Sequence, residues 1–318
     1  MMALSHDFPF DPTYGYDLDA LLAVHPPEPL PDFATFWESL YAGALGVDPR
    51  PTLDHCEHAL PRHEVLRLTY RSTDDFPIHG WLLRPLAQPI KRGFILGHGY
   101  EALERPDYHL PLDDAVYLVP CFRGLGRSAR APIPSQPEEH ILHGIDSPKR
   151  YILGGCAADI WTGVSALLEL FPEVAGRIGY MGISLGGGVG ALAMPWDSRL
   201  ARGHLNIPTF GHQPMRLRLP TTGSASALQR YQRQYHTALQ TLCYFDAAAA
   251  ARYMHRPVHV AAARFDPMVA PPTQFAIYNA LPGPRQLQVL DAGHFDYPQR
   301  RRQQKELMAG LRPFFEPL

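Results

Sequence analysis

The chain has 318 residues, of which 46% are hydrophobic and 19% charged, and its formal net charge is −2. This composition is ordinary for a globular enzyme with a sizeable core, and the near-neutral charge excludes a broad electrostatic attraction to nucleic acid or to an acidic membrane surface. The four cysteines stand far apart without any C-x-x-C pair, which argues against a metal site of the zinc type and against a disulfide framework.

Residues 1–62 are interpreted as an N-terminal extension. They do not begin with a basic segment followed by an apolar one, and no apolar stretch of the chain approaches the roughly 18 residues that a membrane span needs. We therefore expect a cytoplasmic protein without a membrane partner. Within the extension, the segment PDFATFW at 31–37 places a proline and an acidic residue in a first turn, which predicts a helix.

Short apolar strands alternate with helices along the rest of the chain. The predicted helices cover 149–171, 185–194, 272–281 and a C-terminal segment ending near Phe315, where the basic run at 300–302 lies on a solvated face. The predicted strands are 64–70, 78–83, 93–97, 115–119, 178–183, 258–263 and 286–290. This alternation predicts a doubly wound, mostly parallel sheet in a single α/β domain over 1–318, with a helical insertion or lid at 208–256.

The segment GISLG at 182–186 fits the nucleophile elbow, Gly-x-Ser-x-Gly. In that turn a serine, here Ser184, sits on a sharp bend between a strand and a helix, and the glycines allow the two backbones to pass closely. The five-residue match alone is weak, because glycine and serine are common in ordinary turns.

The partners that a serine nucleophile needs follow in the expected order. Asp266 comes just after the strand at 258–263, and His294 comes just after the strand at 286–290. A serine hydroxyl needs a base to take its proton, and the base needs an acid that fixes its tautomer. The sequence therefore predicts a catalytic triad of Ser184, Asp266 and His294. Asp291 competes for the acid role, but a side chain that caps the following turn is the preferred interpretation.

The segment His98-Gly99-Tyr100 follows an early strand and begins a loop. Such a loop commonly gives one backbone N–H to the oxyanion hole, while the residue after the nucleophile gives the other. This predicts Tyr100 and Leu185 as the two donors and gives His98 a structural role in the turn.

The chain resembles the acetyl xylan esterase and cephalosporin C deacetylase family, which is carbohydrate esterase family 7 of the α/β-hydrolase superfamily. The similarity runs from Pro31 to the C-terminal helix. The matching motifs are HGY at 98–100, RGLG at 123–126, GISLGG at 182–187, TLCYFD at 241–246, PPTQFAIYN at 271–279 and GH at 293–294.

Three positions depart from the family pattern. Leu185 and Leu125 stand where the family has glutamines, and Phe295 stands where it has a glutamate. The N–H of residue 185 is unaffected by its side chain, so oxyanion binding should persist. The side chains of Tyr100, Leu185 and Phe295 are expected to close the acyl side of the substrate pocket, and Tyr100 and Phe295 are predicted to contact substrate. Arg123 is interpreted as a residue that anchors its loop.

The resemblance implies a serine carboxylester hydrolase that removes acetyl or other short acyl groups from sugars or similar alcohols. Such a mechanism needs no metal and no organic cofactor. The resemblance also implies a homohexamer with its active sites facing an internal cavity, in which the N-terminal extension and residues 80–85 are candidate contacts. An amidase or peptidase on the same fold, and a non-catalytic scaffold, remain as alternatives.

Overall fold

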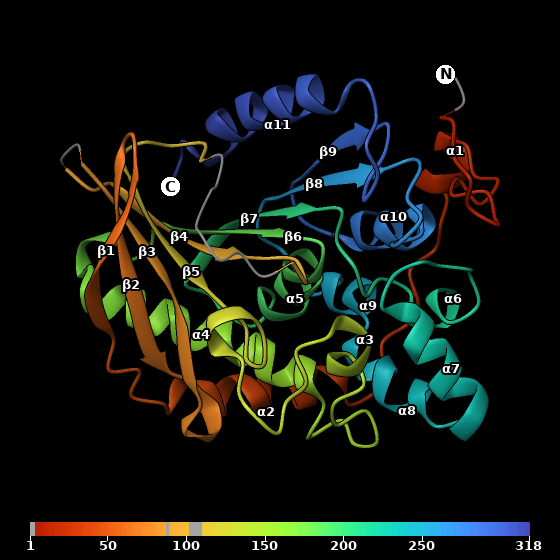
Figure 1. The fold of residues 1–318 in the computed structure, drawn as a ribbon, viewed down its shortest axis with the longest axis horizontal. Coiled ribbons are helices and arrows are strands. Elements are labelled where there is room, and N and C mark those ends of the chain that lie inside the picture. Colours follow the sequence, from red (N-terminus) through yellow and green to blue (C-terminus); the bar gives the residue numbers. More distant parts are fainter. Residues whose placement is uncertain (1–3, 87–88, 102–109) are drawn as a thin grey trace.

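The computed structural model describes residues 4–86, 89–101 and 110–318, and its strands form one mixed sheet (Figure 1). The described residues contain nine strands, in the spatial order β1-β2-β3-β5-β4-β6-β7-β8-β9. They are β1 (Thr52–Leu60), β2 (His63–Arg71), β3 (Pro77–Pro85), β4 (Arg92–Gly97), β5 (Ala115–Pro120), β6 (Ile178–Ile183), β7 (Leu200–Asn206), β8 (Val258–Ala263) and β9 (Arg285–Leu290).

Two kinds of pairing meet in this sheet. Strands β1, β2, β3 and β5 pair antiparallel, whereas each pair from β5 through β4, β6, β7 and β8 to β9 is parallel. Parallel strands have both faces covered by helices, so their sequences read as continuous apolar runs, and β4, β5 and β8 are buried at every position. The predicted doubly wound, mostly parallel sheet is confirmed.

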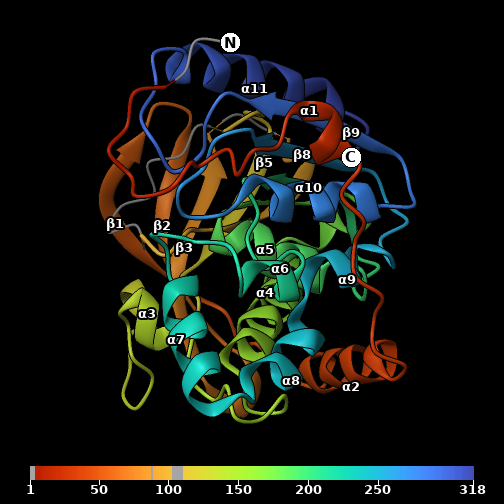
Figure 2. The same ribbon diagram turned by 90° about the vertical axis from the view of Figure 1, so that its right-hand side faces the viewer.

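Helices cover both faces of the sheet (Figures 1 and 2). On one face α4 (Ile152–Leu170), α5 (Leu185–Ala193) and α10 (Pro271–Ala280) join the larger apolar core. On the other face α11 (Arg300–Phe315) inserts Leu311 and Phe315 beside Phe94 and Tyr117. These helices start and end within a few residues of their predicted bounds.

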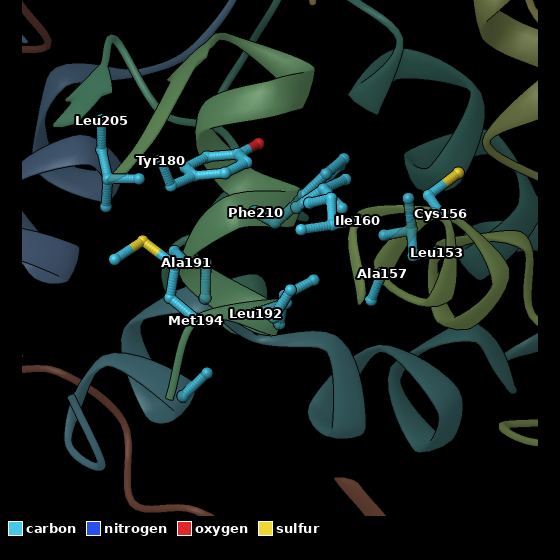
Figure 3. Close-up of a cluster of buried hydrophobic side chains, with 14 of the residues drawn as sticks. Leu153, Cys156, Ala157, Ile160, Tyr180, Ala191, Leu192, Met194, Leu205 and Phe210 are labelled. Atoms are coloured by element: carbon cyan, nitrogen blue, oxygen red, sulfur yellow. The ribbon is translucent and has the colours of Figure 1, made fainter. Parts of the chain in front are cut away.

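Figure 3 shows part of the larger core, where Ile160 of α4 and Leu192 of α5 lie near Tyr180 of β6. Helix α4 has 19 residues and is long and apolar enough, by length and composition alone, to cross a membrane. The expectation that no stretch approaches this length is therefore wrong. Of an 18-residue window of this helix, 78% is buried inside the protein, and the helix packs against α2 (Phe33–Leu45) and α5, as a core helix does.

The extension at 1–62 contains the predicted helix α2, preceded by the short helix α1 (Leu18–Leu22). It also contains β1, which pairs with β2 at the edge of the sheet. Strand β1 was not expected from the sequence, because the segment TLDHCEHAL carries charged and histidine side chains along an edge strand that faces water at several positions. Residues 52–60 therefore belong to the sheet.

The segment 208–256 is helical, as predicted. It holds α6 (Gln213–Arg216), α7 (Ala225–Tyr235), α8 (Ala238–Leu242) and α9 (Ala247–Ala251). Helix α7 packs near the short helix α3 (Pro137–His140), away from the sheet (Figure 2). Helix α9 differs from the others, because its five alanines are all buried against α5 and α10. The last part of the insertion therefore belongs to the hydrophobic core.

Candidate active site

Ser184 lies at the sharp turn between β6 and α5. Its backbone has φ 53° and ψ −110°, a left-handed conformation that costs a non-glycine residue free energy and that recurs at the nucleophile of such elbows. Neighbouring backbone groups hold it there: the Ser184 N–H donates to the Asn206 carbonyl (2.9 Å), and the Ser184 carbonyl accepts from Gly188 (2.9 Å) and Thr209 (3.2 Å). The strained residue is therefore fixed by β7 and by its own helix.

The glycines on either side of Ser184 have a steric function. A Cβ on Gly182 would lie 2.5 Å from the Gly186 carbonyl oxygen, and a Cβ on Gly186 would lie 2.3 Å from the backbone of Gly97 in β4. Neither approach can be relieved by a side-chain rotation, because the neighbours are backbone. The predicted reason for glycine at these positions, close passage of the backbones, is confirmed.

The structure brings Ser184, His294 and Asp266 together from the ends of β6, β9 and β8. His294 Nε2 lies 2.8 Å from Ser184 Oγ, and His294 Nδ1 lies 2.8 Å from Asp266 Oδ2. An ionised carboxylate only accepts hydrogen bonds, so Nδ1 carries the proton and Nε2 is left as the acceptor for the serine hydroxyl. This tautomer is the one that can take the Ser184 proton.

Asp266 is fully buried and its carboxylate is held by four donors. Oδ1 accepts the backbone N–H groups of Met268 and Val269 (2.9 Å each), and Oδ2 accepts Gln274 Nε2 (2.9 Å) in addition to His294. These hydrogen bonds compensate the cost of burying the charge and fix the direction in which the carboxylate points.

Asp291 does not reach the His294 ring, and its carboxylate makes no hydrogen bond within the part of the chain that the structure describes. The expected cap on the following turn is therefore not formed by that side chain. Instead Gly293 lies so close to Asp266 that a Cβ there would be 2.5 Å from Oδ2, which explains the glycine before His294.

Two opposing effects set the pKa of His294. Burial alone would lower it, because an imidazolium is poorly solvated in the interior, but the charge of Asp266, the hydrogen bond to it and the charge of Glu101 together have a larger effect. The pKa of His294 is therefore raised above its usual 6.5.

The loop after β4 lies against the elbow. The Gly186 N–H donates to the His98 carbonyl (2.9 Å), and a Cβ on Gly99 would lie 3.8 Å from Ser184 Cβ. Leu185 is the first residue of α5, so its N–H has no partner within the helix, and neither that group nor the Tyr100 N–H has an acceptor among the described residues. Two unpaired donors thus border the nucleophile.

His98 has the structural role expected of it. The Phe122 N–H donates to His98 Nε2 (2.9 Å), so Nδ1 carries the proton and donates to the Gly99 carbonyl (2.5 Å). Burial lowers the pKa of His98 to about 4, so the ring stays neutral and holds the turn.

The side chains expected to line the acyl pocket lie in different surroundings. The Leu185 side chain is completely buried in the core, because α5 is buried on all sides, so the expectation that it closes the pocket is wrong. The Phe295 ring packs against Phe265 and Phe8. Tyr100 is partly exposed, and its role in contacting substrate, like that of Phe295, stays a prediction.

The Tyr100 ring is tied to the loop that carries Arg123. Its hydroxyl lies 3.3 Å from His140 Nδ1, and His140 Nε2 donates to the Arg123 carbonyl (3.0 Å). Arg123 is itself buried and paired with Asp159 of α4 (Nη2 to Oδ1, 2.7 Å). The interpretation of Arg123 as an anchor of its loop agrees with these contacts. Leu125 of the same loop is buried in the core.

Several contributing residues were not singled out from the sequence. Gln274 lies within a motif of the family resemblance, yet its role as a donor to Asp266 depends on how α10 packs behind β8. His140 lies in a segment without periodicity, and no local pattern marks it. Among the described residues, no group of three or more His, Cys, Asp or Glu side chains is placed to hold a metal ion.

Comparison with known proteins agrees with this geometry. Among solved structures, the acetyl xylan esterase from Paenibacillus sp. R4 superposes with a TM-score of 0.80 at 23% identity, covering 93% of this chain and 99% of the other. Acetyl xylan esterase 1 from Thermoanaerobacterium sp. JW/SL YS485 gives a TM-score of 0.79 at 21% identity, covering 95% and 99%. An acylaminoacyl peptidase from Pyrococcus horikoshii gives 0.63 at 14% identity, covering 81% of this chain but 42% of the peptidase.

At these identities the superpositions establish the fold, which is the α/β-hydrolase fold. The family model described as acetyl xylan esterase (AXE1) matches residues 15–309, nearly the whole chain. The chain therefore belongs to the acetyl xylan esterase family, and it is a carboxylic ester hydrolase that acts on acetyl esters.

Proposed function

We propose that this protein removes acetyl and other short acyl groups from acetylated sugars or related alcohols through a covalent acyl-enzyme on Ser184. The observation that carries the proposal is the continuous relay from Ser184 Oγ through His294 to Asp266, with both distances at 2.8 Å. Family membership supports the acetyl group, and the names of the similar structures support a sugar as the alcohol half.

The first half of the reaction transfers the acyl group to the enzyme. His294 Nε2 accepts the Ser184 proton while Oγ bonds to the ester carbonyl carbon, and the negative charge that develops on the carbonyl oxygen is stabilised by the Leu185 and Tyr100 N–H groups. The N-terminus of α5 adds a favourable dipole at the same point. His294 then gives its proton to the leaving alkoxide as the carbon–oxygen bond breaks.

The second half returns the enzyme to its starting state. His294 takes a proton from a water molecule, whose oxygen attacks the acyl carbon, and the same two N–H groups stabilise the second tetrahedral intermediate. When that intermediate collapses, the proton on His294 returns to Ser184 and the carboxylic acid leaves. Asp266 remains ionised throughout and stabilises the imidazolium each time it forms.

A homohexamer in the cytoplasm completes the proposal. The family resemblance supports the assembly, with the N-terminal extension and residues 80–85 as candidate contacts between subunits; within 80–85 the exposed side chain is Arg84. All four cysteines, Cys56, Cys121, Cys156 and Cys243, are unpaired in the structure, which suits a reducing compartment.

The test is replacement of the nucleophile. Ser184→Ala should lower kcat for an acetyl ester by on the order of 10⁴-fold or more and abolish labelling by a fluorophosphonate, while the exposed Ser135→Ala should change neither. Near-normal turnover in Ser184→Ala would overturn the mechanism. An unreactive wild-type enzyme would favour the scaffold, and faster cleavage of acyl amides than of acetyl esters would favour the amidase.

A further inference from the structure

The first described residues, 4–15, cross the two loops that carry Asp266 and His294, and we refer to them as the N-terminal strap. All but the last of them lie before the region that the family model matches, which begins at residue 15. Neither the family assignment nor the triad itself accounts for the contacts they make.

The strap holds the acid loop through its backbone and one phenol. The Asp266 N–H donates to the Pro12 carbonyl (3.0 Å). The Tyr14 hydroxyl donates to the Pro220 carbonyl (2.8 Å) and lies 3.5 Å from the Asp266 carbonyl. Burial and the nearby Asp266 charge raise the pKa of Tyr14 well above its usual value, so the phenol keeps its proton and remains a donor. The strap thus contacts the catalytic acid on both its N–H and its C=O side.

The strap holds the base loop through an aromatic cluster. Phe8 packs edge-on against Phe295, the residue after His294, with ring centroids 5.8 Å apart. Phe295 packs against Phe265, the residue before Asp266, at 5.0 Å, and His6 covers the same Phe265 ring at 5.3 Å. Each catalytic loop therefore contributes at least one ring to a cluster that the strap completes.

The strap has local structure of its own. The Asp11 carboxylate accepts the backbone N–H (2.9 Å) and the hydroxyl (2.6 Å) of Thr13, which closes a turn. Tyr14 and Gly15 follow with φ 55° and 73°, and this left-handed pair directs the Tyr14 side chain back toward Asp266. The turn presents the Pro12 carbonyl and the Tyr14 hydroxyl to the same loop.

We propose that the N-terminal strap is a positioning element that fixes Asp266 and His294 relative to each other. The inference rests on the proposed catalytic roles of these two residues. Apart from the triad contact, the loops are joined by the packing of Phe265 on Phe295 and by the hydrogen bond from the Gly293 N–H to the Phe265 carbonyl (2.8 Å). A misplacement of about 1 Å in a catalytic group can cost on the order of 10²-fold in rate, so added restraints on the two loops act on kcat.

The experiment uses the full-length chain with one or both attachments removed. Tyr14→Phe deletes the phenol hydrogen bonds, Phe8→Ala removes the ring from the aromatic cluster, and the double variant releases both. We expect each single variant to lower kcat about three- to tenfold with KM within about twofold of wild type, measured well below the unfolding temperature. The double variant should lose more than either single one, because each attachment partly compensates for the loss of the other.

Two control variants separate positioning from general stability. Asp7→Asn changes an exposed strap residue that has no ion pair or hydrogen bond within the described structure, and it should leave kcat unchanged. Phe8→Tyr keeps a ring in the cluster and should restore kcat. A purely structural strap would lower the unfolding temperature without a change in kcat.

The outcomes distinguish this inference from the proposed function. If the wild-type enzyme is labelled at Ser184 and hydrolyses acetyl esters while the double variant keeps full kcat, the positioning role is wrong and the mechanism stands. If the double variant does not fold, the single variants decide by the same criterion. If the wild-type enzyme is neither labelled nor active, the proposed function fails first, and the positioning role fails with it.

Discussion

The pKa of His294 is lowered by burial and raised by the charge of Asp266. The base must be neutral to accept the Ser184 proton, so kcat/KM should rise with pH through the pKa of His294 in the free enzyme. Because Asp266 raises that pKa, the acid limb of the profile should have its midpoint above 6.5. A midpoint below 6.5 would contradict this account of the site. The ion pair between His294 and Asp266 stabilises the folded state when His294 is protonated. This contribution is complete at pH values below the pKa of His294 in the unfolded chain, and it is lost as the pH rises through the higher pKa of the folded state.

Replacing Asp266 tests the same two opposing effects on the pKa of His294. Asp266→Asn removes the charge, so burial should dominate and the midpoint of the acid limb should move to lower pH. The variant should also lose on the order of 10⁴-fold in kcat, because an amide can donate to Nδ1 and favour the wrong tautomer. The pH profile of kcat/KM for one acetyl ester measures both effects, and an unchanged midpoint would exclude Asp266 as the partner of His294.

Tyr100 is one of the side chains that we expect to limit acyl length. An additional methylene in a closed pocket typically changes discrimination by about 1–3 kcal/mol, so kcat/KM should fall roughly tenfold or more from acetyl to butyryl esters of one alcohol. Tyr100→Ala should flatten that slope. Tyr100→Phe is the matched control, because it keeps the ring and loses only the contact with His140. A profile that rises with chain length would contradict the short-acyl assignment.

Among single residues, the sequence carries enough information to find Ser184, Asp266 and His294, because each follows a recognisable strand and their order is restricted. It does not carry the contacts that hold them. Gln274 and Tyr14 reach Asp266 from positions 8 and 252 residues away in the chain, and such pairings are set by packing and not by any local pattern.

At the scale of secondary-structure elements, the crossing of α5 and β4 behind the elbow leaves no room for a side chain. Gly186→Ala should destabilise the protein by about 1–3 kcal/mol or more, since the added Cβ would meet the Gly97 backbone at 2.3 Å. The same change at Gly310, in α11 with nothing within 4 Å, should instead stabilise by roughly 0.5–1 kcal/mol. Chemical denaturation of both variants checks this, and equal shifts would contradict the steric argument.

Strand β7 was also not predicted, and the physical reason differs from that for the edge strand β1. Strand β7 (LARGHLN) has charged, glycine and histidine residues and lacks a continuous apolar run, although it is paired on both sides in the sheet. Buried His204 of β7 lies beside His259 of β8 (Nδ1 to Nδ1, 3.1 Å), so its polar ring is satisfied by a neighbouring strand. When a buried polar side chain is hydrogen-bonded by a residue of the neighbouring strand, the strand need not be apolar, and the hydrophobic pattern of the sequence does not predict it. The apolar strands β4, β5, β6 and β8 were predicted within one residue of their bounds.

At the scale of the whole molecule, the assembly is the property that most needs measurement. The family resemblance leads us to expect six chains per particle, with the N-terminal extension and residues 80–85 at contacts between subunits. Static light scattering at micromolar concentration measures this directly. One chain per particle would exclude the hexamer without affecting the mechanism, because every residue of the proposed triad lies within one chain.

The sheet also determines when the site comes into existence during folding. Ser184 and His294 are 110 residues apart in the chain, and they meet only after β6, β7, β8 and β9 lie side by side in parallel. Parallel pairings of this kind close long loops before they gain contacts, which makes them slow to form compared with helices. A chain that has formed most of its helices is therefore still without a relay between serine and histidine. Ester hydrolysis by this protein therefore indicates that the parallel part of its sheet has formed.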